Sequence, residues 1–144
     1  MSSLTKEQRI EQRRAAREQA FVLIFEKSFT EKEADDIIAE AIEARELEPV
    51  PFAISSFKGV FENIEVLDSI IEELAKGWQL KRLPRTALAV LRLALYEMIY
   101  LHNEIPYSVS INEAVELAKK FGGKDDSSFI NGILSAQLKR LGEE

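Results

Sequence analysis

Basic side chains recur at helical spacing near the start of this 144-residue chain. Successive members lie three or four residues apart, with one further arginine beside them: Lys6, Arg9, Arg13, Arg17 and Arg14. A helix would gather this set on one face, because residues three and four apart are neighbours on a helix surface. A guanidinium group offers a planar fork of N–H donors that matches phosphate oxygens. The set is therefore a candidate phosphate-binding strip; a solvated helix face, partly neutralised by nearby glutamates, is the alternative that the pattern leaves open.

Residue types needed for most catalysis and for transition-metal binding are scarce. The chain has no cysteine and one histidine, which excludes disulfides and thiol catalysis and disfavours a zinc site. No phosphate loop, dinucleotide-binding motif or catalytic triad pattern is present. The paired acids Asp125 and Asp126 precede an expected helix, where capping explains them more simply than catalysis. We predict a protein that is not an enzyme and that uses no cofactor or metal.

Charge is unevenly distributed along the chain. The formal net charge is -6, yet residues 31–48 alone hold eight acidic and two basic residues, so this segment accounts for the whole acidic excess. A small basic site is thus compatible with an acidic protein. The first residues contain no apolar signal-peptide segment, which favours a cytosolic protein.

The helices that would position these residues are organised around residues 83–101, LPRTALAVLRLALYEMIYL, the most apolar stretch of the chain. Such a helix must be packed on most of its circumference, and it is too short and too charged for a membrane span. Arg92 and Glu97 lie five residues apart on it and cannot pair well with each other. Each should meet an opposite charge or a helix end from a neighbouring segment, because an unpaired buried charge is costly.

The first half of the chain shows helical periodicity on either side of an acidic segment. Two capping boxes, Thr5 with Gln8 and Thr30 with Glu33, predict helices that end near residues 27 and 44. Residues 52–77 should form two helices that meet near residues 63–65, because one helix of that length is unusual without a break.

The second half continues the helical pattern after the central helix. Ser108 or Ser110 should begin the next helix, and residues 125–128 should cap the last one. Gly132 inside that last helix suggests that another backbone approaches closely. Trp78 is expected to plug the edge of the core rather than to bind a ligand. No segment alternates as a strand does.

Together these patterns predict an all-α protein of six or seven helices, in two crossing sets that share the central apolar helix. We treat residues 1–144 as one domain. Its N-terminal helical subdomain should cover about residues 5–62, and its C-terminal helical subdomain should cover about residues 63–144.

Three ordered motifs make the chain similar to a known family. They are RRAAREQAFVLIFEKS near the start, VLRLALYEM in the central helix, and IPYSVSINEAVELAKKFGGKDDSSFINGIL after it. In this order they strongly resemble the NusB family of bacterial transcription antitermination factors, from about residue 9 to residue 141. The resemblance implies two perpendicular helical bundles in a bacterial cytoplasmic protein. It also implies binding of the single-stranded boxA element of ribosomal RNA transcripts. That binding is made jointly with NusE, the tenth protein of the small ribosomal subunit, within an RNA polymerase elongation complex that holds other Nus factors.

The resemblance also assigns roles to individual residues. It makes three arginines phosphate-contact candidates: Arg13, Arg14 and Arg17. It places four residues in a second RNA-binding patch, where aromatic faces and a basic side chain can meet unstacked bases: Lys119, Phe121, Asp125 and Phe129. For the NusE contact it indicates Phe25, where the family often has tyrosine, and Ala87, where the family usually has an acidic residue associated with that contact. At Ala87 the chain therefore lacks the acidic group that the resemblance associates with the NusE contact.

Two other functions remain open from the sequence. One is a helical protein-protein interaction module without RNA activity, for instance a homodimer that hides its RNA face. The other is a detached accessory module, because NusB-like domains are also found fused to ribosomal RNA cytosine methyltransferases. Because we find no cofactor-binding motif in these 144 residues, we expect at most a detached accessory module in that case.

Overall fold

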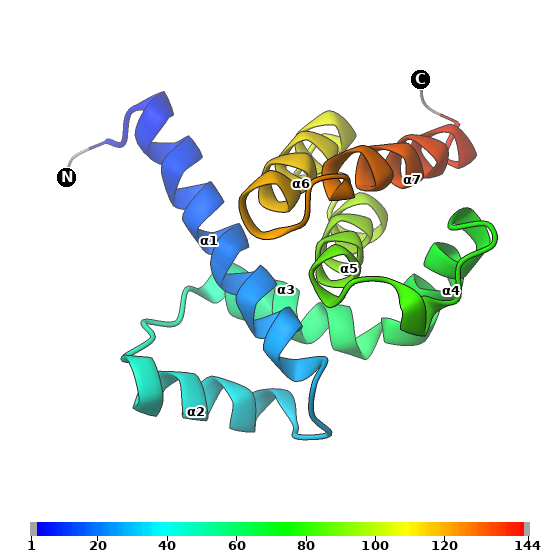
Figure 1. The fold of residues 1–144 in the computed structure, drawn as a ribbon. Helices are drawn as coiled ribbons and strands as arrows, with labels where there is room; N and C mark the ends of the chain where they lie inside the picture. The colour runs from blue at the N-terminus through cyan, green and yellow to red at the C-terminus, as the bar shows by residue number, and fades with distance from the viewer. Residues whose placement is uncertain (1–2, 143–144) are drawn as a thin grey trace.

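The computed structural model describes residues 3–142, and α-helices account for most of them (Figure 1). In chain order the elements are α1 (Lys6–Lys27), α2 (Ala34–Arg45), α3 (Pro51–Glu62), α4 (Ile64–Leu74), the short 3-10 turn η1 (Leu80–Arg82), α5 (Arg85–Tyr100), α6 (Tyr107–Phe121) and α7 (Asp126–Arg140). No strand occurs in the described part of the chain. The predicted all-α class is therefore confirmed, with seven α-helices over residues 3–142.

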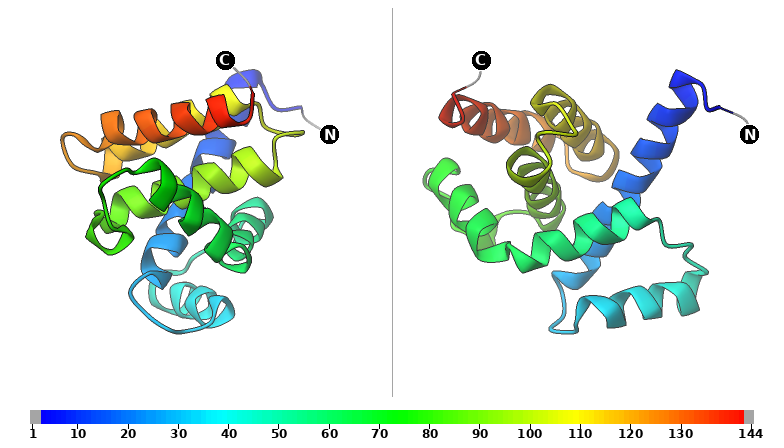
Figure 2. Two further views of the ribbon diagram at one scale, coloured as in Figure 1. Left: turned by 90° about the vertical axis from the view of Figure 1, so that its right-hand side faces the viewer. Right: turned by 180° about the vertical axis from the view of Figure 1, so that it is seen from behind.

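Helix α5 lies at the centre of the molecule, as the apolar pattern predicts. It packs against α1, α3, α4, α6 and α7. Figures 1 and 2 show α2 and α3 on one side of it and α6 and α7 on the other. Eleven of its sixteen residues are buried, including all of residues 87–95, so the middle of the helix is covered on every side. No helix within residues 3–142 is long and apolar enough to cross a membrane.

The charged residues of α5 meet partners from other helices, as expected. The Nε atom of Arg92 lies 2.9 Å from Oδ1 of Asp68 on α4. The carboxylate of Glu97 is 1% exposed and receives two hydrogen bonds from Arg17 on α1. These two pairs tie both neighbouring helices to α5 without leaving a buried charge unpaired.

The break between α3 and α4 falls at Asn63, within the predicted range. Asn63 has a non-helical backbone conformation, and its side-chain Nδ2 donates a hydrogen bond to the carbonyl of Gly59 at 2.8 Å. The boundary that we proposed between subdomains lies at this residue. One continuous hydrophobic core nevertheless includes residues from both sides of it, such as Leu23 and Leu134.

Two predicted helix starts are wrong. The Thr30 hydroxyl accepts a hydrogen bond from the Lys32 N–H, so it stabilises a turn, and α2 begins later, after an extended Glu33. Helix α6 begins at Tyr107, directly after Pro106, so Ser108 and Ser110 lie inside it. A proline favours this position because its fixed φ suits helix entry and its missing N–H needs no partner there.

Two expectations about single residues are also wrong. A Cβ atom added to Gly132 would meet nothing within 4 Å, so no backbone approaches it. The side chain of Trp78 does not plug the core, because this residue is 54% exposed. It follows Gly77, whose φ of +84° turns the chain away from α4 in a conformation that disfavours other residues.

Candidate nucleic-acid interface

The N-terminal half of α1 presents the basic residues that the sequence singled out. Its first turn is held by a capping box, in which Thr5 Oγ1 accepts from the Gln8 N–H and Gln8 Oε1 accepts from the Thr5 N–H. Arg13 is exposed, and its guanidinium carbon lies 4.9 Å from the centre of the Phe52 ring. This cation–π contact restrains the side chain while its N–H donors still face solvent.

Arg14 is held by an acid on α6. Its Nε atom lies 3.0 Å from Glu113 Oε1, its Nη2 atom lies 3.1 Å from Oε2, and the side chain of Arg14 remains 52% exposed. The hydrogen bond and the charge of Glu113 raise the pKa of Arg14 above its ordinary value. The guanidinium therefore stays charged at every working pH, and its outer edge can receive a phosphate oxygen.

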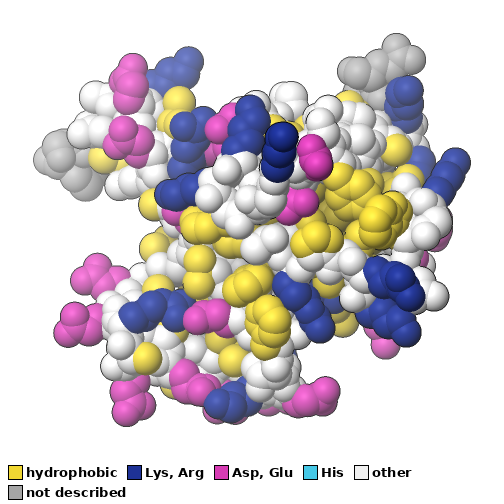
Figure 3. Space-filling view, in the orientation of Figure 1, with side chains coloured by type: hydrophobic (Ala, Val, Ile, Leu, Met, Phe, Trp, Pro, Cys, Tyr) yellow, Lys and Arg dark blue, Asp and Glu magenta, His cyan; other side chains and the backbone are white. Residues whose placement is uncertain are grey.

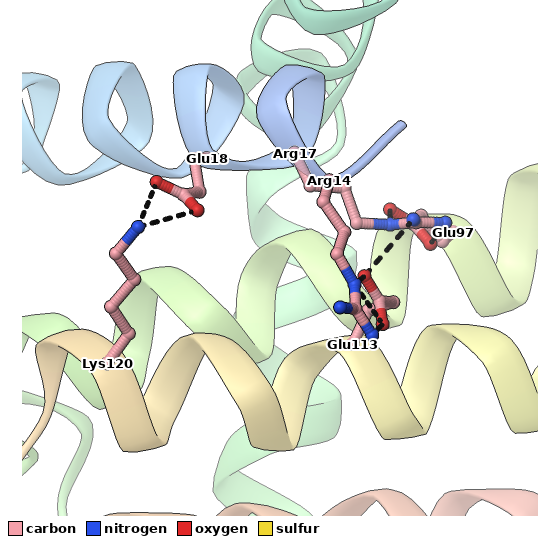
Figure 4. Close-up of polar contacts among 6 residues, drawn as sticks. All are labelled: Arg14, Arg17, Glu18, Glu97, Glu113 and Lys120. Carbon is pink, nitrogen blue, oxygen red and sulfur yellow. Dashed lines mark hydrogen bonds and ion pairs between the residues drawn. The ribbon is translucent and has the colours of Figure 1, made fainter. Parts of the chain in front are cut away.

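Arg17 does not fit the expectation that it contacts phosphate. Its side chain is 4% exposed, and its Nε and Nη2 atoms bond the Glu97 carboxylate at 2.9 and 3.1 Å (Figure 4). The Ser110 hydroxyl donates to the same carboxylate at 2.8 Å. Burial against α5 and α6 removes Arg17 from the surface. We correct its role to one of positioning α1 against these two helices.

Three contacts place α1 and α6 side by side in the same direction. Arg14 meets Glu113, Glu18 accepts a hydrogen bond from Lys120 Nζ at 2.9 Å, and the Phe21 ring stacks on the Phe121 ring at 5.0 Å between centres. Because the pairs advance together along both helices, the arginines and the end of α6 share one surface. Figure 4 shows two of these contacts bridging the helices.

A groove of about 780 Å³ lies between the N-terminal halves of α1 and α6. Its lining is basic along α1 and uncharged along α6 apart from one glutamate: Lys6, Arg9, Ile10, Arg13, Arg14, Arg17, Ser108, Val109, Asn112 and Glu113. A groove with this lining can hold a polyanionic chain, because cationic side chains follow one wall and the opposite wall offers amide and hydroxyl groups.

The predicted second patch lies at the end of α6 and the start of α7. Lys119 is exposed and lies 3.9 Å from Glu116, and Phe121 is 36% exposed, with Lys120 Nζ 5.4 Å from its ring centre. Asp125 is exposed at the start of α7, whereas Phe129 is half-buried. The structure therefore connects Phe121 to α1 through the Phe21 ring, on the same helix as the arginines. It places Asp125 and Phe129 beyond a short loop from Phe121.

The two residues expected at a partner interface differ in exposure. Phe25 is half-buried, and its ring packs edge-on against Phe29 at 4.9 Å. Ala87 is 1% exposed and belongs to the core. A methyl group so deeply covered cannot contact a partner, so the expectation for Ala87 is corrected. The exposed residues nearby are Phe29 and Arg85, whose guanidinium carbon lies 5.4 Å from the Phe29 ring centre.

Sequence reasoning missed three residues at this surface. Glu113 holds Arg14, Lys120 joins α6 to α1, and Trp78 lies beside Phe129 with 6.4 Å between ring centres. The first two depend on which helices become neighbours, for which the local pattern gave no signal. Among residues 3–142 no group of three or more potential acidic, histidine or cysteine ligands surrounds a metal position.

Comparison with known proteins gives consistent matches over most of the chain. The model of the NusB family matches residues 14–139. The transcription antitermination protein NusB of Acetivibrio thermocellus is 43% identical over 129 residues, which cover 88% of both chains. A solved structure of T. maritima NusB has a TM-score of 0.78 and 32% identity, covering 88% of this chain and 90% of that one.

A further match is a crystal structure of the antitermination factors NusB and NusE in complex with dsRNA. One chain in it has a TM-score of 0.78 and 26% identity, covering 89% of this chain and 96% of its own length. That complex holds an RNA and a protein partner together.

Proposed function

The chain belongs to the NusB family, and from this premise we propose that it is a transcription antitermination factor that binds the single-stranded boxA element of ribosomal RNA transcripts. It does so jointly with NusE, as part of an RNA polymerase elongation complex in the bacterial cytoplasm. The family is one of RNA-binding factors and not of enzymes.

The observation that carries the proposal is the juxtaposition of α1 and α6, which three side-chain contacts join. Arg13 and Arg14 present guanidinium groups on α1. At the end of α6, Lys119 is exposed and Phe121 presents an aromatic ring with the Lys120 ammonium beside it. Single-stranded RNA is bound by this combination, because cations follow the phosphates while aromatic rings stack on unpaired bases. Phe129 would extend the same surface across the loop between α6 and α7.

The number of exposed cations sets a limit on the electrostatic contribution to RNA affinity. Three or four phosphate contacts on single-stranded RNA give a log-log salt slope of about -2 to -3. Affinity should then fall about 20- to 60-fold between 50 and 200 mM salt. This is a modest contribution for a protein of net charge -6, so the chain alone should bind weakly.

A protein partner can raise the affinity for RNA. A second RNA-binding subunit makes its own contacts to the same strand at a high effective concentration. The aromatic surface around Phe25 and Phe29 at the end of α1 is our candidate for the NusE contact. It lies outside the groove lined by the arginines, so both partners can be bound at once.

The test is a titration of fluorescently labelled boxA RNA, and of a scrambled RNA of equal length, with NusE present. The double variant Arg13→Ala and Arg14→Ala should weaken boxA binding about tenfold or more. The variant with Lys32→Ala and Lys58→Ala is the matched control. It removes the same charge, but from exposed ion pairs with Glu40 and Asp35 in the α2 and α3 region. Equal affinity of the two double variants, or equal binding of both RNAs by the parent, would count against the proposal.

A further inference from the structure

The connection between α4 and α5 is strongly basic on an acidic protein. Residues 75–85, AKGWQLKRLPR, contain four basic residues and no acid. Lys76, Lys81, Arg82 and Arg85 are all exposed. None of the four forms an ion pair with another residue of the described range 3–142; Arg85 donates to the carbonyl of Ser28 at 3.1 Å and lies over the Phe29 ring. Their charge is therefore available to an anionic ligand.

Trp78 projects from the same connection. It is the single tryptophan of the chain and is 54% exposed, an unusual position for so large an apolar side chain. The turn at Gly77 and a hydrogen bond from the Trp78 N–H to the carbonyl of Ala75 at 2.9 Å fix its backbone. The indole is thus presented to solvent by an ordered turn.

Trp78 lies beside Phe129, the α7 aromatic residue of the predicted second patch. Its ring lies 6.4 Å from the Phe129 ring at an angle of 66°. A groove of about 530 Å³ lies beside Trp78. Its polar lining has three basic residues, one amide and one acid: Lys81, Arg85, Arg92, Gln79 and Glu72. In the right half of the space-filling view, a hydrophobic patch below α7 has Lys and Arg side chains along its lower edge (Figure 3).

From this arrangement we propose that the α4–α5 connection is a second contact for single-stranded RNA, in which Trp78 stacks on an unpaired base and Lys81 and Arg82 bind the flanking phosphates. The inference rests on the proposed function, because it continues the path of the same RNA beyond Phe129. Exposed aromatic rings interleaved with unneutralised cations are the chemistry that binds single strands without sequence preference. An acidic protein segment would use the cations but would not need an indole beside Phe129.

The single tryptophan provides the experiment. RNA of at least the boxA length is titrated into the NusE complex while two signals are followed. The anisotropy of labelled RNA reports total binding, and Trp78 emission, corrected with a Trp78→Phe complex for any tryptophan of NusE, reports this site. We expect quenching of Trp78 in parallel with binding. The Trp78→Ala variant should bind about 5- to 150-fold more weakly, whereas Trp78→Phe should retain most of the affinity.

Each other outcome has a distinct meaning. If RNA binds with unchanged Trp78 emission and Trp78→Ala has parental affinity, the second contact is refuted and the proposed function stands. If NusE alone changes the emission and RNA adds nothing, the connection contacts the protein partner and the inference is again refuted. If the anisotropy shows no RNA binding at all, the proposed function fails as well. Circular dichroism of Trp78→Ala checks that the fold is intact, as expected for an exposed side chain.

Discussion

Replacing Arg17 with methionine tests the role that burial gives this arginine. Arg17 and Glu97 are 4% and 1% exposed, and they share two hydrogen bonds at 2.9 and 3.1 Å. Methionine fills much of the same space but leaves the Glu97 carboxylate with the Ser110 hydroxyl as its nearest donor. Removing one partner of a buried pair costs about 3–5 kcal/mol. For a chain of this length the Tm should fall by about 6–20 °C.

Thermal unfolding followed by circular dichroism measures this loss. The double variant Arg17→Met and Glu97→Leu should recover much of it, because a buried pair can often be exchanged for apolar residues of similar volume. Lys32→Ala breaks the exposed pair with Glu40 and serves as the control, with an expected change below about 1 kcal/mol.

The same variant separates a positioning role from a phosphate contact. At a temperature where the Arg17→Met protein is folded, its log-log salt slope for RNA binding should equal that of the parent. Arg13→Ala should reduce the magnitude of the slope by about 0.7, the contribution of one contact. An unchanged Tm for Arg17→Met, or a slope reduced as in Arg13→Ala, would refute the reasoning.

Two further predictions concern stability alone. Gly132→Ala should stabilise the protein by about 0.5–1 kcal/mol in a urea titration, because the position is helical and open to a methyl group; a loss of stability would show that a neighbour had been overlooked. Burial, and after it the charge of Glu62, raises the pKa of Tyr96 above its ordinary value of 10.0. The neutral phenol therefore contributes fully to the free energy of unfolding below that pH, and this contribution is lost as the pH rises past it. Unfolding measured from pH 8 to 11 should show a steeper decline for the parent than for Tyr96→Phe, and parallel curves would contradict this.

The helical framework was predictable because its signals are local. The apolar run of α5, the capping box at Thr5 and the break near Asn63 all depend on residues close in sequence. It was also predictable that Arg92 and Glu97 would have charged partners, because an unpaired buried charge costs free energy. The identity of those partners could not be predicted from the sequence, because Arg17 is 80 positions from Glu97.

The errors at the site have the same origin. Helical spacing groups Arg13, Arg14 and Arg17 on one face, but it does not show that α5 and α6 cover the last of them. The family resemblance places Ala87 at a partner-contact position, yet its methyl group lies in the core. Trp78 looked like a core residue because of its type, whereas the turn at Gly77 exposes it. Tertiary neighbours decide each of these cases.

The most direct test of the composite surface is a map of backbone amide chemical shifts during titration with boxA RNA. The largest changes should fall on two segments far apart in sequence, the first half of α1 around Arg13 and Arg14 and the end of α6 from Lys119 to Phe121. Both segments should saturate at the same RNA concentration. Changes confined to one segment, or centred on the acidic α2, would contradict this prediction.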